Sequence, residues 1–152
     1  MIGEYKQRSD NTIIGVIYPF PEELIDRLFI NQKDIFIKYI PHEPTKKSKI
    51  KLQSGMKIYF YVPKSKKAII GEATIEEISY MKIKDILKNY ESRIIPTEKK
   101  LIEYSNHREN KKAQVLVLTK VIKYKKDKFI NINITMAGIY VDSDNKSKIF
   151  GE

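Results

Sequence analysis

Apolar and polar residues alternate over several short segments of this chain, which is the pattern of β-strands. Ile13–Tyr18 is a run of β-branched and aromatic residues that stops at a proline, and Met56–Val62 is a second strong strand pattern. Asp34–Ile40 alternates residue by residue, so Lys38 shares one face of this strand with two apolar side chains. These three segments are predicted to be strands.

Further strands are predicted later in the chain, at Ala68–Ile78, Ala113–Val121, Phe129–Met136 and Gly138–Val141. Gly71 lies inside the first of these and indicates a bulge or the close approach of another backbone. The basic segment Lys123–Lys128 is predicted to be a turn.

Short helices are predicted between these strands. The first begins at Pro21, the second spans Lys82–Glu91, and the third runs from Glu98 to about Arg108 with Thr97 as its N-cap. This order favours an α+β fold, a mixed β-barrel of about six or seven strands with short helices packed around it, over a doubly wound parallel sheet.

The length of the chain suits one domain. We expect a single domain over residues 1–152, with loosely ordered ends at 1–12 and 143–152. No secretion signal and no membrane-spanning run is visible, and cysteine is absent, so we expect a cytoplasmic protein without disulfides. The two histidines, His42 and His107, lack the spacing of metal ligands, so we expect no transition-metal site and no cofactor.

Basic residues outnumber acidic ones by 29 to 19, which gives a formal charge of +10. An excess of this size is the electrostatic signature of a protein that binds a polyanion such as nucleic acid. A surface rich in charged residues is also a general adaptation to high temperature, and the composition leaves both interpretations open.

Lys38 is the first candidate for a binding residue, because a cation on an apolar strand face either reaches solvent or is held there for an anion. Tyr59 and Tyr61 share one face of their strand, and aromatic rings of this kind stack on unpaired bases or pack in a core. Our spatial hypothesis is that Lys38 and Tyr61 open onto one shared, positively charged hollow.

Other candidates lie near predicted strand and helix ends or carry charge. Tyr18 and Tyr39 end their strands near a rim, and Glu72 follows a glycine in an apolar strand, where it could pair with Lys38. Each has an ordinary structural explanation as well, as a packed tyrosine or a solvated carboxylate. Two polar residues at a helix end and lysine clusters in predicted loops complete the set: Asn106, Arg108, Lys46 to Lys51, Lys64 to Lys67, and Lys123 to Lys128.

Four segments together carry a family resemblance. They are Gly15-Val16-Ile17-Tyr18-Pro19, Asp34-Ile35-Phe36-Ile37-Lys38-Tyr39, the stretch from Gly55 through Phe60-Tyr61 to Gly71-Glu72-Ala73, and Thr135-Met136-Ala137-Gly138. With them, the chain from Ile13 to Val141 resembles an archaeal family of the PUA-like superfamily, related to ASCH and EVE domains. This resemblance implies a pseudobarrel whose cleft accommodates RNA or a flipped, often modified, base.

In ASCH relatives that hydrolyse acetylcytidine, a Gly-x-Lys-Thr-x-Thr-x-Arg pattern supplies a catalytic lysine and threonine. By this resemblance, Lys33 stands at the lysine position and Lys38 at the arginine position. Asp34 and Phe36 replace both threonines, which argues against that chemistry here.

Three functions therefore stay open. The first is a non-catalytic binding module for RNA or a modified nucleobase. The second is a hydrolase acting on a modified nucleoside, in which Lys33 or Lys38 has a depressed pKa and Glu72 assists. The third is an interaction module for an acidic protein partner.

Overall fold

The computed structural model describes residues 13–48, 50–130 and 132–151. Its centre is a six-stranded mixed sheet with the strand order β2-β5-β4-β3-β1-β6. β1 and β3 are parallel, and the other neighbouring pairs are antiparallel. The strands are β1 (Gly15–Pro19), β2 (Ile35–Lys38), β3 (Lys57–Val62), β4 (Ala68–Met81), β5 (Ala113–Phe129) and β6 (Ile139–Val141).

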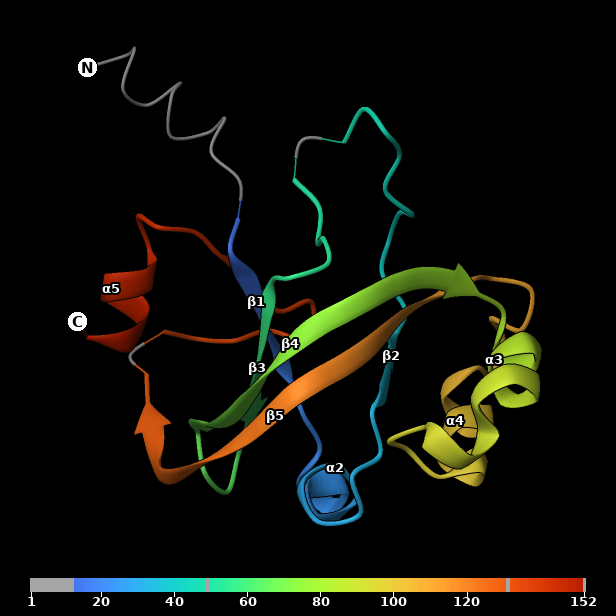
Figure 1. Ribbon diagram of the computed structural model, residues 1–152, viewed down its shortest axis with the longest axis horizontal. Coiled ribbons are helices and arrows are strands. Elements are labelled where there is room, and N and C mark those ends of the chain that lie inside the picture. Colours follow the sequence, from blue (N-terminus) through green and yellow to red (C-terminus); the bar gives the residue numbers. More distant parts are fainter. Residues whose placement is uncertain (1–12, 49, 131, 152) are drawn as a thin grey trace.

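Short helices lie around the long β4–β5 pair (Figure 1). α3 (Ile83–Tyr90) and α4 (Glu98–Tyr104) lie together at one end of this pair, and α5 (Lys146–Phe150) lies at the other. α2 (Ile25–Phe29) follows β1 after one turn of 3-10 helix, Glu22–Leu24. None of the helices in the described part of the chain is long and apolar enough to span a bilayer.

The expected closed barrel is wrong, because the sheet curls but stays open between its edge strands, β2 and β6. Side chains bridge the opening instead: the rings of Tyr18 on β1 and Phe36 on β2 stack, with centroids 5.5 Å apart and planes 6° from parallel. The free edge of β2 is partly covered by another segment, since the Ile95 N–H donates to the Ile35 carbonyl at 3.0 Å.

The two faces of the sheet form separate apolar clusters. The inner cluster fills the curl of the sheet and includes Tyr18, Phe36, Phe60 and Leu28 of α2. On the outer face, one cluster packs β2 and β5 against α3 and α4, and another packs β1 and β3 against α5. Strand alternation places a side chain in one cluster and its sequence neighbour in another.

Two predictions for the later part of the chain are wrong. Lys123–Lys128 is not a turn, because β5 continues through it. The segment contains a bulge: Gly71 pairs with Lys123 and Ile69 pairs with Lys128, so the four residues 124–127 lie opposite the single residue Ile70. Residues 130 and 132–138 form no strand. They lead to a turn in which the Gly138 N–H donates to the Thr135 carbonyl at 2.9 Å, directly before β6.

Gly71 fulfils the prediction of a close backbone approach. A Cβ atom at this position would lie 2.5 Å from the Ile122 carbonyl oxygen and 2.7 Å from the ring of Phe29. The end of the chain differs from expectation, because α5 is a regular helix whose Ile149 is only 4% exposed. The other end expected to be loose, residues 1–12, lies outside the described residues.

Candidate functional site

An apolar cleft of about 240 Å³ opens on the side where β2 and β1 do not pair. Its walls come from the Pro19–Pro21 segment after β1, the end of β2, Ile95 and Pro96, α4, and Met136. Segments far apart in the sequence therefore meet at one hollow, which is the usual construction of a ligand pocket.

Lys38 stands in the wall of this cleft, and its ammonium group is held from two sides. Nζ donates to the Met136 carbonyl oxygen at 2.7 Å and lies 5.1 Å from the centre of the Tyr18 ring. Burial, followed by the positive charge of Arg108, lowers the pKa of Lys38 below its ordinary value. Lys38 is thus a partly desolvated cation held in a fixed position at an apolar surface.

A buried hydrogen-bond network lies beside Lys38. The Tyr18 hydroxyl donates to Gln114 Oε1 at 3.1 Å, and Gln114 Nε2 donates to the Tyr80 hydroxyl at 3.5 Å. Gln114 is 1% exposed and pairs with Lys38 in the β2–β5 register. Burial raises the pKa of Tyr18 above its ordinary value, so this phenol stays protonated.

Arg27 of α2 fixes the opposite wall of the cleft. Its guanidinium donates to three successive carbonyl groups, those of Ile94, Ile95 and Pro96. The fork of an arginine suits such a set of acceptors, because its donors are held in one plane. Arg27 therefore sets the position of the backbone that forms this wall.

Arg108 lies beside the cleft on the aromatic pair Tyr39 and Tyr104. Its guanidinium carbon is 4.1 Å from the Tyr39 ring centre and 4.7 Å from that of Tyr104, which lines the cleft. The Tyr39 hydroxyl donates to the Arg108 carbonyl at 3.2 Å, and the Tyr39 N–H donates to the Tyr104 hydroxyl at 2.8 Å. Tyr39 is 7% exposed, so it supports Arg108 and does not present a free ring at the rim.

The hypothesis that Lys38 and Tyr61 share one hollow is wrong, because they lie on opposite faces of the sheet. Tyr59 and Tyr61 belong to the outer cluster under α5, where the Tyr59 ring lies 5.0 Å from that of Phe150. Phe60, between them, faces the inner cluster with Tyr18. Alternation within β3 separates these side chains correctly, but sequence alone does not show which face meets Lys38.

Glu72 also lies on the outer face, so its proposed pairing with Lys38 is wrong. Its register partner is Tyr59, and its carboxylate accepts hydrogen bonds from Lys57 at 2.9 Å and from Tyr124 at 2.8 Å. Burial acts to raise the pKa of Glu72, but the hydrogen bonds from Lys57 and Tyr124 outweigh it and hold this pKa below its ordinary value.

Comparison with known proteins identifies the family. The family model described as "Domain of unknown function (DUF365)" matches residues 13–143. The chain belongs to this family. No curated protein matches it in sequence.

This DUF365 chain shares its fold with solved ASCH structures. It matches the crystal structure of ASCH from Zymomonas mobilis with a TM-score of 0.71 and 14% identity, over 89% of this chain and 92% of that chain. A serine-to-alanine mutant of that protein gives a TM-score of 0.70 and 14% identity, over 89% and 93%. At this identity the likeness establishes the fold alone: the chain has an ASCH-like fold with an open sheet.

The other candidate residues of the DUF365 chain lie away from the cleft. Lys33 is on the surface, where Nζ donates to the Ser92 carbonyl at 2.8 Å, and Asn106 is exposed beyond the end of α4. Lys64 lies in the exposed turn between β3 and β4. Among the residues that the structure describes, no three potential metal ligands come together.

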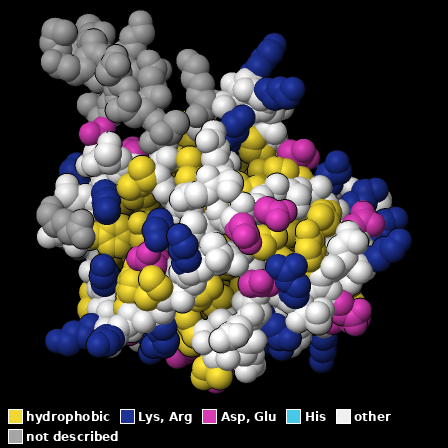
Figure 2. Space-filling model, viewed as in Figure 1, with side chains coloured by type: hydrophobic (Ala, Val, Ile, Leu, Met, Phe, Trp, Pro, Cys, Tyr) yellow, Lys and Arg dark blue, Asp and Glu magenta, His cyan; other side chains and the backbone are white. Residues whose placement is uncertain are grey.

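The lysine clusters do not form one continuous patch. Lys64 to Lys67 lies next to Lys123 to Lys128, because Ala68 pairs with Phe129 and Ile69 with Lys128. The cluster that begins at Lys46 lies in the loop between β2 and β3. Lysine and arginine side chains are spread over the face in Figure 2, with acidic side chains among them.

Three contributors to the cleft were not predicted: Gln114, Arg27 and the carbonyl group of Met136. Gln114 carries a signal in the sequence, because it is the one polar residue in the apolar run from Ala113 to Leu118. Arg27 looks like a solvated helix residue, and a backbone carbonyl has no sequence signal. Only the first could have been found from the sequence.

Proposed function

We propose that this DUF365 domain binds RNA at an unpaired, modified base, which enters the apolar cleft beside Lys38. The observation that carries this proposal is the position of the Lys38 ammonium group, in the wall of a cleft that is otherwise mainly apolar. A nucleobase has flat faces that stack on apolar surfaces and an edge that carries hydrogen-bonding groups, so this combination of surfaces suits it.

The size of the cleft supports a small planar ligand. Its volume of about 240 Å³ lies below the roughly 300–1,000 Å³ of pockets for drug-sized molecules. One base and its modification make a smaller ligand than such a molecule. The sugar and phosphate groups of the same nucleotide would then remain outside the cleft.

The hydrogen-bonding capacity of Lys38 supports recognition of the base edge. An ammonium group has three N–H donors, and the Met136 carbonyl accepts from it at 2.7 Å. The remaining donors can serve a base carbonyl or a modifying acyl group at the cleft. A partly desolvated donor discriminates well, because a ligand that lacks the matching acceptor leaves it without a partner.

Binding of synthetic RNA tests the proposal. Fluorescence anisotropy would compare short single strands that contain cytidine, acetylated cytidine or another modified base at one central position. Lys38→Met should weaken binding at least about tenfold, the loss expected when a charged hydrogen bond is removed. Lys125→Met is the matched control, because Lys125 is exposed on β5 away from the cleft. Equal binding by both variants would exclude the cleft as the site.

One observation favours a second function, hydrolysis of a modified nucleoside. Burial and Arg108 lower the pKa of Lys38, and a lysine with a lowered pKa is a better nucleophile or base at neutral pH. Lys33 is less suited to this role, because it does not line the cleft and its ammonium group donates to the Ser92 carbonyl. Glu72 cannot assist Lys38 from the opposite face of the sheet.

Incubation with modified nucleosides separates these functions. Retention without turnover supports the binding module, and release of the modifying group supports the hydrolase. If neither occurs, the third function, an interaction module for an acidic protein, is favoured. A cytoplasmic location, an archaeal source and a relation to EVE domains remain predictions from the sequence.

A further inference from the structure

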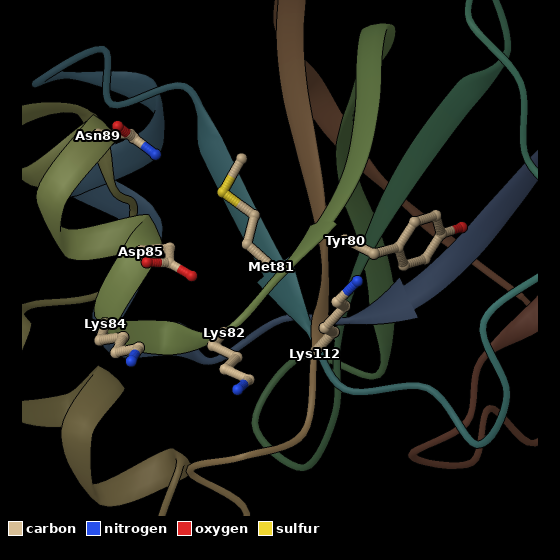
Figure 3. Close-up of a pocket in the computed structure, with 7 residues that line it drawn as sticks. All are labelled: Tyr80, Met81, Lys82, Lys84, Asp85, Asn89 and Lys112. Atoms are coloured by element: carbon tan, nitrogen blue, oxygen red, sulfur yellow. The ribbon is translucent and has the colours of Figure 1, made fainter.

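A second hollow lies where β4 leads into α3 and where β5 begins (Figure 3). It has a volume of about 500 Å³, and three lysines line it: Lys82, Lys84 and Lys112. In the close-up, the side chains of Lys82 and Lys84 extend the same way from the start of α3, and Tyr80 points away from the helix. Asp85 is the one carboxylate in this lining.

Shared residues connect this hollow to the cleft beside Lys38. A smaller hollow of about 170 Å³ adjoins it, since both are lined by Tyr80 and Lys112, and the smaller one is also lined by Lys111. Lys111 Nζ lies 6.0 Å from the centre of the Tyr39 ring, on which Arg108 also packs.

Tyr104 completes the connection, because it contacts Arg108 and lines the cleft itself. We call this row of cations the basic track. It consists of Arg108, Lys111, Lys112, Lys82 and Lys84.

The charges of the basic track have no ion-pair partner in the described part of the chain. Elsewhere the protein does pair such groups, as in Lys57 with Glu72 and Arg93 with Asp34. A row of unpaired cations attracts a polyanion, because each anionic group it binds releases counterions.

We propose that the basic track binds the backbone phosphates of the single strand whose base occupies the cleft. This inference rests on the proposed function, since it takes the cleft as the anchor point of the strand. The strand would leave the cleft past Arg108, pass Lys111 and Lys112, and reach Lys82 and Lys84. A single strand suits this path best, because a base within a duplex would first have to leave its stack at a cost of a few kcal/mol.

The salt dependence of binding tests this path. Anisotropy would follow an oligonucleotide of about eight nucleotides, within the ~4–16 nucleotides typical of single-strand sites, over a series of salt concentrations. The test variant replaces Lys82, Lys84 and Lys112 with Met. The control variant replaces Lys123, Lys125 and Lys126, three exposed lysines on the outer half of β5, and so removes the same charge.

The two variants should differ in slope. Each lost phosphate contact lowers the slope of log Kobs against log salt by about 0.7, so the test variant should lose about 2 and the control variant close to none. Binding of the free modified nucleoside should be the same in both, because a nucleoside carries no phosphate. Circular dichroism melting would establish that both variants are folded.

The outcomes separate the two proposals. If the test and control variants have equal slopes, the basic track is wrong, and the cleft stands as long as Lys38→Met weakens nucleoside binding. If the test variant alone loses slope while Lys38→Met binds normally, the track binds nucleic acid and the cleft is wrong. If the unaltered protein binds no oligonucleotide at all, both proposals fail.

Discussion

The ammonium group of Lys38 lies 2.7 Å from the carbonyl oxygen of Met136, to which it donates a hydrogen bond. This contact joins β2, one edge of the sheet, to the turn that precedes β6, the other edge. It therefore spans the opening where the sheet fails to close. The same side chain forms part of the cleft and part of what holds its two sides together.

Lys38 should make stability depend on pH in the alkaline range. Its pKa is lower in the folded protein than the ordinary 10.5 of the unfolded chain, so the unfolded state binds more protons between the two values. The free energy of unfolding that Lys38 contributes therefore rises with pH over this window. The free energy of unfolding of Lys38→Met has no such contribution. Any amount by which it exceeds that of the unaltered protein should therefore shrink as the pH approaches 10.5, as measured by urea unfolding.

Lys100→Met is the control for this prediction, because Lys100 also lines the cleft but is exposed. Its ammonium group meets solvent in both the folded and the unfolded state. A parallel change in both variants would contradict the role assigned to burial of Lys38.

Tyr18→Phe should destabilise the fold by about 1–3 kcal/mol, because it leaves Gln114 Oε1 buried without its donor. The pKa of Tyr18 is raised in the folded state, so its contribution is full below pH 10.0 and is lost as the pH rises further. The gap between the two proteins should therefore narrow above pH 10.0, as measured by urea unfolding. Tyr61→Phe, a buried tyrosine of the outer cluster, is the control and should cost less.

Arg27→Lys should loosen the wall of the cleft while keeping the charge. A lysine cannot reproduce the fork that holds the carbonyl groups of Ile94, Ile95 and Pro96, and the loss should be about 2 kcal/mol. Hydrogen exchange should accelerate at the Ile95 amide, which bonds to Ile35. Arg93→Lys is the matched control, because its exposed pair with Asp34 is worth about 1 kcal/mol or less. Unchanged exchange at Ile95 would contradict the positioning role of Arg27.

The alternation of apolar residues predicts much of the fold correctly. It places Lys38 on the face of Phe36 and separates Phe60 from its tyrosine neighbours, as the structure confirms. These predictions succeed because the side-chain direction within one strand depends on local backbone geometry alone. The requirement for a glycine at position 71 is likewise visible from the sequence.

The errors concern relationships between strands. Lys123–Lys128 has the composition of a turn, but pairing with β4 holds it as a bulged strand, and no residue within the segment reports that pairing. Alternation shows which neighbours share a face with Lys38 in its strand and with Tyr61 in its strand. Whether these two side chains lie on the same face of the sheet depends on the register across four strands. Whether the edge strands β2 and β6 meet is likewise decided by the arrangement of the whole sheet, for which no single segment carries a sequence signal.

Glu72→Gln tests the separation of the two faces. It removes the ion pair with Lys57, so we expect a loss of about 1 kcal/mol or less at neutral pH. Because the pKa of Glu72 is lowered in the folded state, its stabilisation is present above pH 4.5 and is lost as the pH falls through that lowered value. Urea unfolding from pH 7 downward should show the two proteins converging, and binding in the cleft should be unaffected. A large loss of ligand binding would place Glu72 in the site after all.

The gap between the edge strands makes the cleft depend on side-chain contacts, unlike the interior of a closed barrel. A barrel widens only by breaking the backbone ladder that seals it, whereas here the described contacts across the gap are made by side chains, chiefly the Tyr18–Phe36 stack and the Lys38–Met136 bond. Entry of a ligand larger than the cleft would require these side chains to move, and rotation of the buried Tyr18 ring would also break its hydrogen bond to Gln114 Oε1. The backbone hydrogen bonds of the sheet would be kept, so the cost of widening the cleft would fall on a few side chains.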